Sequence, residues 1–134
     1  MNVFEYICLD IWQIIFEHCD FLSKVRLTQI CKLFHDNLQI IDFWYIEDKF
    51  KNKLTDDILK NYKYIIKLDT QNNIKINDVS WMSYLQELDS SYNCGIDQNG
   101  IKNLNLIKLN AHDNTKIKDV SWMSNLEELN ANWD

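Results

Sequence analysis

An internal repeat constrains this chain more than any other feature, because it fixes the spacing of buried side chains over the C-terminal half. Residues 78–83, Asp-Val-Ser-Trp-Met-Ser, recur 41 residues later as residues 119–124. Across the window 65–88, fifteen of the twenty-four positions are identical to those 41 residues further along. Residues 65–134 are therefore expected to fold as stacked copies of one structural unit.

Each 41-residue period contains two shorter units, marked by leucines at spacings of 20, 21 and 20 residues. These leucines, each lying three residues after another aliphatic residue, are Leu68, Leu88, Leu109 and Leu129. Side chains of a strand alternate between its two faces, so the leucines are expected to point inward and their neighbours outward. The pattern predicts short parallel strands near residues 66–70, 86–90, 107–111 and 127–131.

The pattern resembles the leucine-rich repeat, L-x-x-L-x-L-x-x-N-x-x-I. A small inward residue follows each leucine, and a turn asparagine and a closing isoleucine follow the first three leucines. They are Thr70, Ser90, Ala111 and Ala131; then Asn73, Asn93 and Asn114; then Ile76, Ile96 and Ile117. The asparagine amides are expected to satisfy the backbone of the turns. The resemblance implies a short solenoid with a parallel sheet of about four strands.

The segment 79–85 is similar to the short convex side of internalin-type repeats. That similarity places Trp81 and Trp122 on outward positions. An exposed tryptophan is costly, so we expect the two rings to stack along the convex surface. A contact patch for a partner is the alternative.

Equivalent outward positions of parallel strands line up in rows across the sheet, and here they form three rows on the concave face. The rows are Lys67, Glu87, Lys108 and Glu128; Asp69, Asp89, Asn110 and Asn130; and Gln71, Ser91, His112 and Asn132. Opposite charges on adjacent strands attract one another. A solvated sheet face is one interpretation. Because such solenoids usually bind partners on the concave face, we interpret the rows as a surface that binds a protein substrate.

Residues 1–46 differ from the repeats in composition, because aromatic and aliphatic side chains are concentrated there in short helical patterns. Ile11, Ile14 and Ile15, with Trp12 and Phe16 beside them, leave a predicted helix almost no polar face. A unit of this size buries too little of its surface to enclose all of its large apolar side chains. Part of this apolar area is therefore expected to contact another domain or a partner.

The order of residues in 7–46 resembles an F-box, the helical module that binds the Skp-type adaptor of cullin-RING ubiquitin ligases. The resemblance is carried by Ile7 to Ile11, Ile14 to Phe16, Cys19 to Phe21, Val25 to Leu27 and Ile30 to Phe34. Cys8 stands where the family has proline, and Cys31 matches the family's usual packing cysteine. The adaptor-binding residues that the resemblance implies are Ile7, Cys8, Leu9, Ile11, Trp12, Ile14, Ile15, Leu22, Leu27, Ile30 and Phe34.

The whole chain is thus predicted to be an α+β protein. It combines an F-box-like helical domain over 1–46, a linker or capping helix over 47–64 and leucine-rich repeats over 65–134. Thr55 is expected to cap a helix that carries Ile58, Leu59 and Tyr62 on one face and covers the first repeat. The C-terminal repeat is expected to be uncapped and to invite homo-oligomerisation. The combination is similar to F-box and leucine-rich-repeat proteins of large DNA viruses of protists.

Composition excludes several other classes of function. The net charge is −6 and no run of Lys or Arg could follow a phosphate backbone, so nucleic acid is not an expected partner. No segment reaches the roughly 18 apolar residues of a membrane span, and Glu5 and Asp10 do not suit a secretory signal. We expect a soluble, intracellular protein of the cytoplasm, or of a host's cytoplasm if it is viral.

The four cysteines contain no C-x-x-C pair and are expected to be buried thiols. A zinc site formed by His18, Cys19, Cys31 and His35 is the alternative. For an enzyme, Cys94 and His112 lack catalytic partners, and two glycines provide no phosphate-binding loop.

We therefore expect no catalysis, no cofactor and no metal. The favoured interpretation is the substrate-receptor subunit of a Skp-cullin-F-box ligase. The alternative is a non-catalytic scaffold or a homo-oligomeric interaction protein with no link to ubiquitin.

Overall fold

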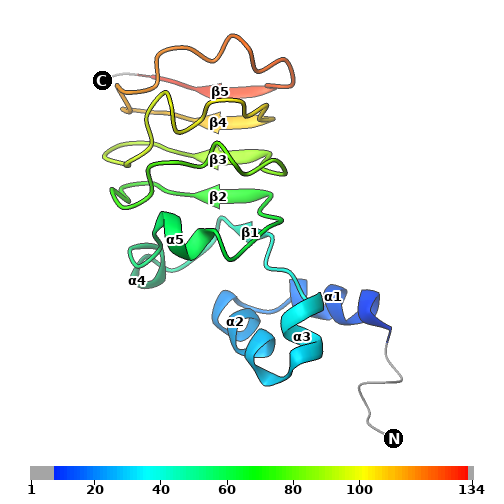
Figure 1. The fold of residues 1–134 in the computed structure, drawn as a ribbon. Helices are drawn as coiled ribbons and strands as arrows, with labels where there is room; N and C mark the ends of the chain where they lie inside the picture. The colour runs from blue at the N-terminus through cyan, green and yellow to red at the C-terminus, as the bar shows by residue number, and fades with distance from the viewer. Residues whose placement is uncertain (1–7, 133–134) are drawn as a thin grey trace, which may run out of the picture. The chain divides into compact units, whose positions relative to one another are not determined.

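The computed structural model describes residues 8–132, which divide into two compact units between Ile40 and Ile41 (Figure 1). Among the described residues there are five helices and one parallel sheet of five strands, so the predicted mixed α+β class is confirmed. No helix in the described part of the chain is long and apolar enough to cross a membrane.

The first unit contains three helices: α1 (Leu9–Glu17), α2 (Phe21–Ile30) and α3 (Lys32–Asn37). The Asp20 carboxylate caps α2 by accepting the backbone N–H of Ser23 at 3.0 Å. This bond and a second one from the Ser23 hydroxyl lower the pKa of Asp20. Phe16 and Phe34 are buried, each 1% exposed, and the Trp12 ring packs against Phe34 with centroids 4.9 Å apart.

The second unit begins with β1 (Asp42–Phe43), two short helices α4 (Asp48–Lys51) and α5 (Asp56–Leu59), and then the repeats. The remaining strands are β2 (Lys67–Asp69), β3 (Glu87–Asp89), β4 (Lys108–Asn110) and β5 (Glu128–Asn130). All neighbours are parallel and follow chain order; α4 and α5 lie between β1 and β2, and from β2 on each strand is joined to the start of the next by a loop (Figure 1). The last four strands lie within the ranges expected from the leucine spacing.

The sheet has five strands instead of the expected four or so, because β1 pairs with β2 and sets Phe43 opposite Leu68. This pairing also corrects the expected end of the helical domain. Residues 41–46 carry the first strand and belong to the second unit, so the first unit ends at residue 40 and not at 46. Phe43 is fully buried and provides the first inward side chain of the sheet.

Three successive coils, coil 1 (65–84), coil 2 (85–105) and coil 3 (106–125), build the core of the second unit. Their inward side chains are buried on every coil, as the repeat predicts. These are the leucines Leu68, Leu88 and Leu109, the small residues Thr70, Ser90 and Ala111, and the isoleucines Ile76, Ile96 and Ile117. Burial of such a continuous apolar column across coils is the main source of stability in stacked repeats.

Two of the three predicted turn asparagines occupy the expected place. The Asn114 amide donates to the backbone carbonyls of Ser90 and Ile96 at 2.7 and 3.1 Å, and its Oδ1 accepts the N–H of Lys116 at 3.1 Å. The Asn73 amide makes the same kind of bonds to the carbonyls of Lys51 and Leu54. Each amide therefore joins its coil to the element before it.

The prediction for the third asparagine, Asn93, is wrong. Asn93 is exposed, and the buried position belongs to Cys94, whose sulfur accepts the N–H of Ile96 at 3.2 Å. Coil 2 is one residue longer than its neighbours, but the extra residue lies after Ile96, because Ile76, Ile96 and Ile117 each follow their inward leucine by eight residues. The inward position at this turn is therefore one residue later in coil 2, at Cys94, without an insertion before it.

The predicted stacking of Trp81 on Trp122 is also wrong. Trp81 lies on coil 1 and Trp122 on coil 3, so coil 2 separates them by two strand spacings, about 10 Å. The Trp81 indole N–H donates to the carbonyl of Asp78, whereas that of Trp122 donates to Leu104 in the preceding coil. Each ring is held by its own local bond.

The segment 47–64 lies against coil 1. The Thr55 hydroxyl accepts the N–H of Ile58 at 3.3 Å and so caps α5, as expected. Leu59 is fully buried, and the Tyr62 ring meets Phe43 edge-on at 5.0 Å. Ile58, which was expected on the same face as Leu59, is 39% exposed.

Candidate binding surfaces

The outward face of the sheet carries the first row of predicted binding residues as two ion pairs. Lys67 Nζ lies 3.0 Å from Glu87 Oε1, and Lys108 Nζ lies 2.7 Å from Glu128 Oε1. The hydrogen bond that Lys67 donates to Glu87 raises the pKa of Lys67, and the bond that Lys108 donates to Glu128 raises the pKa of Lys108. These four side chains are partly exposed and remain available to a partner.

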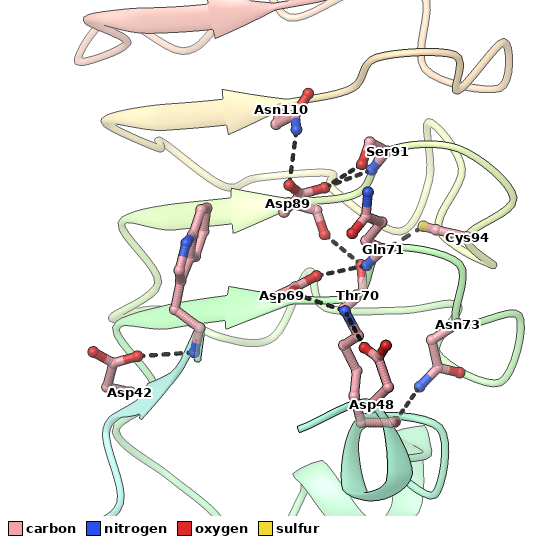
Figure 2. A network of polar contacts seen from close by, with 12 residues as sticks. Asp42, Asp48, Asp69, Thr70, Gln71, Asn73, Asp89, Ser91, Cys94 and Asn110 are labelled. Carbon is pink, nitrogen blue, oxygen red and sulfur yellow. Dashed lines mark hydrogen bonds and ion pairs between the residues drawn. The ribbon is translucent and has the colours of Figure 1, made fainter. Parts of the chain in front are cut away.

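The second row has a structural role that the sequence did not reveal (Figure 2). Each of its side chains accepts the backbone N–H two residues further along, at distances of 2.8, 3.0, 3.1 and 3.5 Å. Figure 2 shows these bonds for Asp69 and Asp89. In order, the acceptors are Asp69, Asp89, Asn110 and Asn130. These bonds turn the chain away at the end of every strand.

Bonds between coils add to this row. Asn110 Nδ2 donates to Asp89 Oδ2 at 2.8 Å, and Lys51 Nζ lies 3.0 Å from Asp69 Oδ2 (Figure 2). Burial of Lys51 opposes its charge, but the hydrogen bonds and charges of Asp69 and Asp48 outweigh burial and raise its pKa. Most side chains of the second row are therefore engaged in hydrogen bonds or ion pairs within the protein, and Asn130 on β5 is the exposed member of the row.

The third row is less accessible than expected. Ser91 is fully buried, and its hydroxyl donates to Asp89, so it cannot contact a substrate. His112 is mostly covered, with its ring against the edge of Tyr92 at 5.1 Å and Nε2 3.5 Å from Asp113. Gln71 is half-buried and Asn132 is exposed.

Two aromatic residues that were not predicted for the sheet face follow β1. The register that sets Phe43 opposite Leu68 carries Trp44 alongside Asp69, on the outward face. Trp44 borders a hollow of about 500 Å³ whose other residues belong to β4 and β5, apart from Glu127, which directly precedes β5. Tyr45, the next residue, is 91% exposed. The sequence signal was Asp42-Phe43, an outward–inward pair that resembles Lys67-Leu68.

The first unit exposes much of the predicted adaptor-binding set. Exposed apolar side chains lie on all three helices, with exposed fractions of 38–60%. They are Leu9, Ile11, Ile14, Ile15, Ile30 and Leu33. Leu33 was not predicted, although it lies three residues after Ile30. Cys8 is exposed as well, and Trp12, Leu22 and Leu27 are half-buried.

Two residues of that set stand apart. Phe34 is wrong as a contact residue, because it packs against Trp12 in the core and is only 1% exposed. Ile7 lies outside the described residues.

Cys19 and the two histidines of the first unit have local partners. His18 Nδ1 lies 2.8 Å from the carbonyl of Ile14, Cys19 donates to Ile15, and His35 contacts Asp36. Within residues 8–132, no group of three His, Cys, Asp or Glu side chains is placed to hold a metal ion. In the second unit, burial raises the pKa of the Cys94 thiol, which keeps it protonated and weakly nucleophilic.

Comparison with family models, with curated proteins and with solved structures finds no match for this chain.

Proposed function

We propose that this chain is a non-catalytic interaction protein, an F-box and leucine-rich-repeat substrate receptor of a Skp-cullin-F-box ligase. In this proposal the helical unit binds the Skp-type adaptor and the outward face of the solenoid sheet binds a protein substrate. The observation that carries the proposal is the row of exposed aliphatic side chains on α1. Ile11, Ile14 and Ile15 are 50, 58 and 43% exposed on a nine-residue helix.

Exposure of this kind favours a helix-binding partner. Aliphatic area left in water forgoes about 25 cal/mol per Å², and a helical face with several large apolar residues in a small unit is typical of a binding surface. Ile30 and Leu33 extend the apolar character to α2 and α3. The stacked coils support the second half of the proposal, because parallel strands present aligned rows of side chains to a partner.

The test is binding of a recombinant Skp-type adaptor to the full chain and to the double variant Ile11→Asp, Ile15→Asp. The adaptor would bury both isoleucine side chains in the complex, so their replacement by carboxylates should weaken binding by at least about 100-fold. Gln29→Asp, an exposed change on α2 next to Ile30, is the matched control and should bind like the wild type. Circular dichroism should show that the helices of all variants persist. Failure of the wild type to bind the adaptor would contradict the proposal.

A homo-oligomer is the second candidate, and β5 is the observation that favours it. Leu129 is 51% exposed although its equivalents on β2, β3 and β4 are buried, and no described strand pairs with the outer edge of β5. An open edge with an apolar residue favours self-association. A concentration-dependent mass in light scattering that Leu129→Lys abolishes would support this candidate.

A further inference from the structure

The hollow beside Trp44 differs from the rest of the sheet face in combining an aromatic ring with free negative charge. Its residues come from the two ends of the sheet: Trp44, Lys108, Leu109, Asn110, Glu127, Glu128, Leu129 and Asn130. The backbone N–H of Trp44 donates to Asp42 Oδ1 at 2.8 Å, which fixes the chain where the indole leaves it. The ring therefore forms one wall, and β4 and β5 form the other.

The charge of this region is negative. The sheet face and its margin carry six carboxylates and three ammonium groups: Asp42, Asp69, Glu87, Asp89, Glu127 and Glu128 against Lys51, Lys67 and Lys108. Each ammonium group already has an acidic partner, in Asp69, Glu87 and Glu128 respectively. Glu127 forms no ion pair with any described residue, although its charge acts on Lys108. A cationic group would balance the charge of Glu127.

We infer that this hollow binds an arginine side chain of an extended segment in the partner protein, with the guanidinium against the Trp44 indole and its charge directed to Glu127 and Glu128. A guanidinium is planar, stacks on aromatic rings and pairs with two carboxylate oxygens at once, so it matches all three groups better than a compact ammonium does. The inference rests on the proposed role of the sheet face as the substrate-binding surface. It adds that the substrate carries an arginine in an extended segment.

The experiment uses the full chain and three labelled peptides of alternating Gly and Arg, Gly and Lys, or Gly and Glu. Binding is followed by fluorescence anisotropy and by the indole N–H resonances in two-dimensional NMR, with Trp44→Phe identifying the Trp44 signal. The Arg peptide should move the Trp44 resonance and leave that of Trp122, which is bonded to Leu104, in place. Raising the salt from about 0.05 M to about 0.5 M should weaken the binding.

Conservative variants test the carboxylates without disturbing the fold. Glu127→Gln and Glu128→Gln should each weaken binding of the Arg peptide by about threefold to tenfold, the range of an exposed cation contact. Asp57→Asn removes the same charge from α5, where the side chain is 92% exposed, and should leave binding unchanged. Equal or tighter binding of the Lys or Glu peptide, or an unmoved Trp44 resonance, would overturn the inference.

The outcome separates this inference from the proposed function, because the adaptor would bind α1 and not the hollow. Adaptor binding without a response to the Arg peptide would overturn the inference and leave the ligase proposal in place. A response to the Arg peptide without adaptor binding would support the inference and overturn the ligase proposal.

Discussion

Coils 1 and 3 differ from coil 2 in the side chain that they bury at the turn after the strand. Coils 1 and 3 bury an asparagine, Asn73 or Asn114, whose amide binds carbonyls of the preceding element. Coil 2 has Cys94 at that place, one extra residue, and both glycines of the chain. The inward leucine and isoleucine are nevertheless buried in all three coils. The apolar column therefore determines the repeat, and the polar turn can be built in more than one way.

The largest expected effect is in coil 3, where Asn114→Ala would leave the carbonyls of Ser90 and Ile96 buried without their donor. The cost should be about 2–4 kcal/mol of unfolding free energy, measured by urea denaturation. Asn93→Ala is the matched control in coil 2, because Asn93 is exposed, and it should change stability by less than about 0.5 kcal/mol. Equal losses in the two variants would show that the assignment of Cys94 to the buried position is wrong.

Coil 2 carries both glycines of the chain, and its stability should be sensitive to a side chain added at Gly100. A Cβ at Gly100 would collide with the backbone carbonyl oxygen of Asn77 in coil 1. Gly100→Ala should therefore destabilise the fold by about 1–3 kcal/mol in the same denaturation experiment. The neighbouring exposed change Asn99→Ala should be nearly neutral. A neutral Gly100→Ala would mean that coils 1 and 2 can separate there at little cost.

The thiol of coil 2 should make stability depend on pH in a way that the asparagines cannot. Burial raises the pKa of Cys94 above its ordinary value of 9.0, so the folded chain keeps a proton that the unfolded chain loses. Stability should fall as the pH rises above about 9, by at most about 1.4 kcal/mol per pH unit from this group.

Cys94→Ala should remove that part of the slope. The part due to half-buried Tyr62, whose pKa is also raised by burial, should remain. An identical alkaline slope in the variant would contradict the prediction.

The smallest effect is expected on the sheet face, where coils 1 and 2 meet through Lys67 and Glu87. A double-mutant cycle with Lys67→Met and Glu87→Gln should give a coupling of about 0.2–1 kcal/mol, because the Lys67 side chain is 40% exposed and salt screens the pair. The coupling should shrink at high salt. A coupling that is large and insensitive to salt would indicate that the row is a structural element and not an available surface.

The leucine positions and the coil period could be predicted because they depend on a short sequence pattern that recurs along the chain. The strand at Asp42–Phe43 was missed because it lies 25 residues before Leu68 and substitutes Phe for Leu. Trp44 was missed with it, since that residue had been assigned to the helical domain.

The accessibility of the side chains in the three rows on the sheet face was only partly predictable, for a different reason. Alternation along a strand places Asp89 and Ser91 outward, but it cannot show that Ser91 then binds Asp89 and is buried at the turn. Helical spacing likewise does not say which residue of α3 packs inward, and the contact with Trp12 decides it for Phe34.

The strand spacing of the sheet limits how a substrate could be recognised. Neighbouring strands lie about 4.8 Å apart, whereas side chains on one side of an extended peptide repeat about every 6.7 Å. Because the two spacings differ, a peptide that crosses the strands has one side chain aligned with a strand and the next side chain out of step with the neighbouring strand. Across five strands only a few peptide side chains can lie directly over a strand. Such a surface selects a substrate by one well-placed anchor and its spacing, not by a residue-by-residue code.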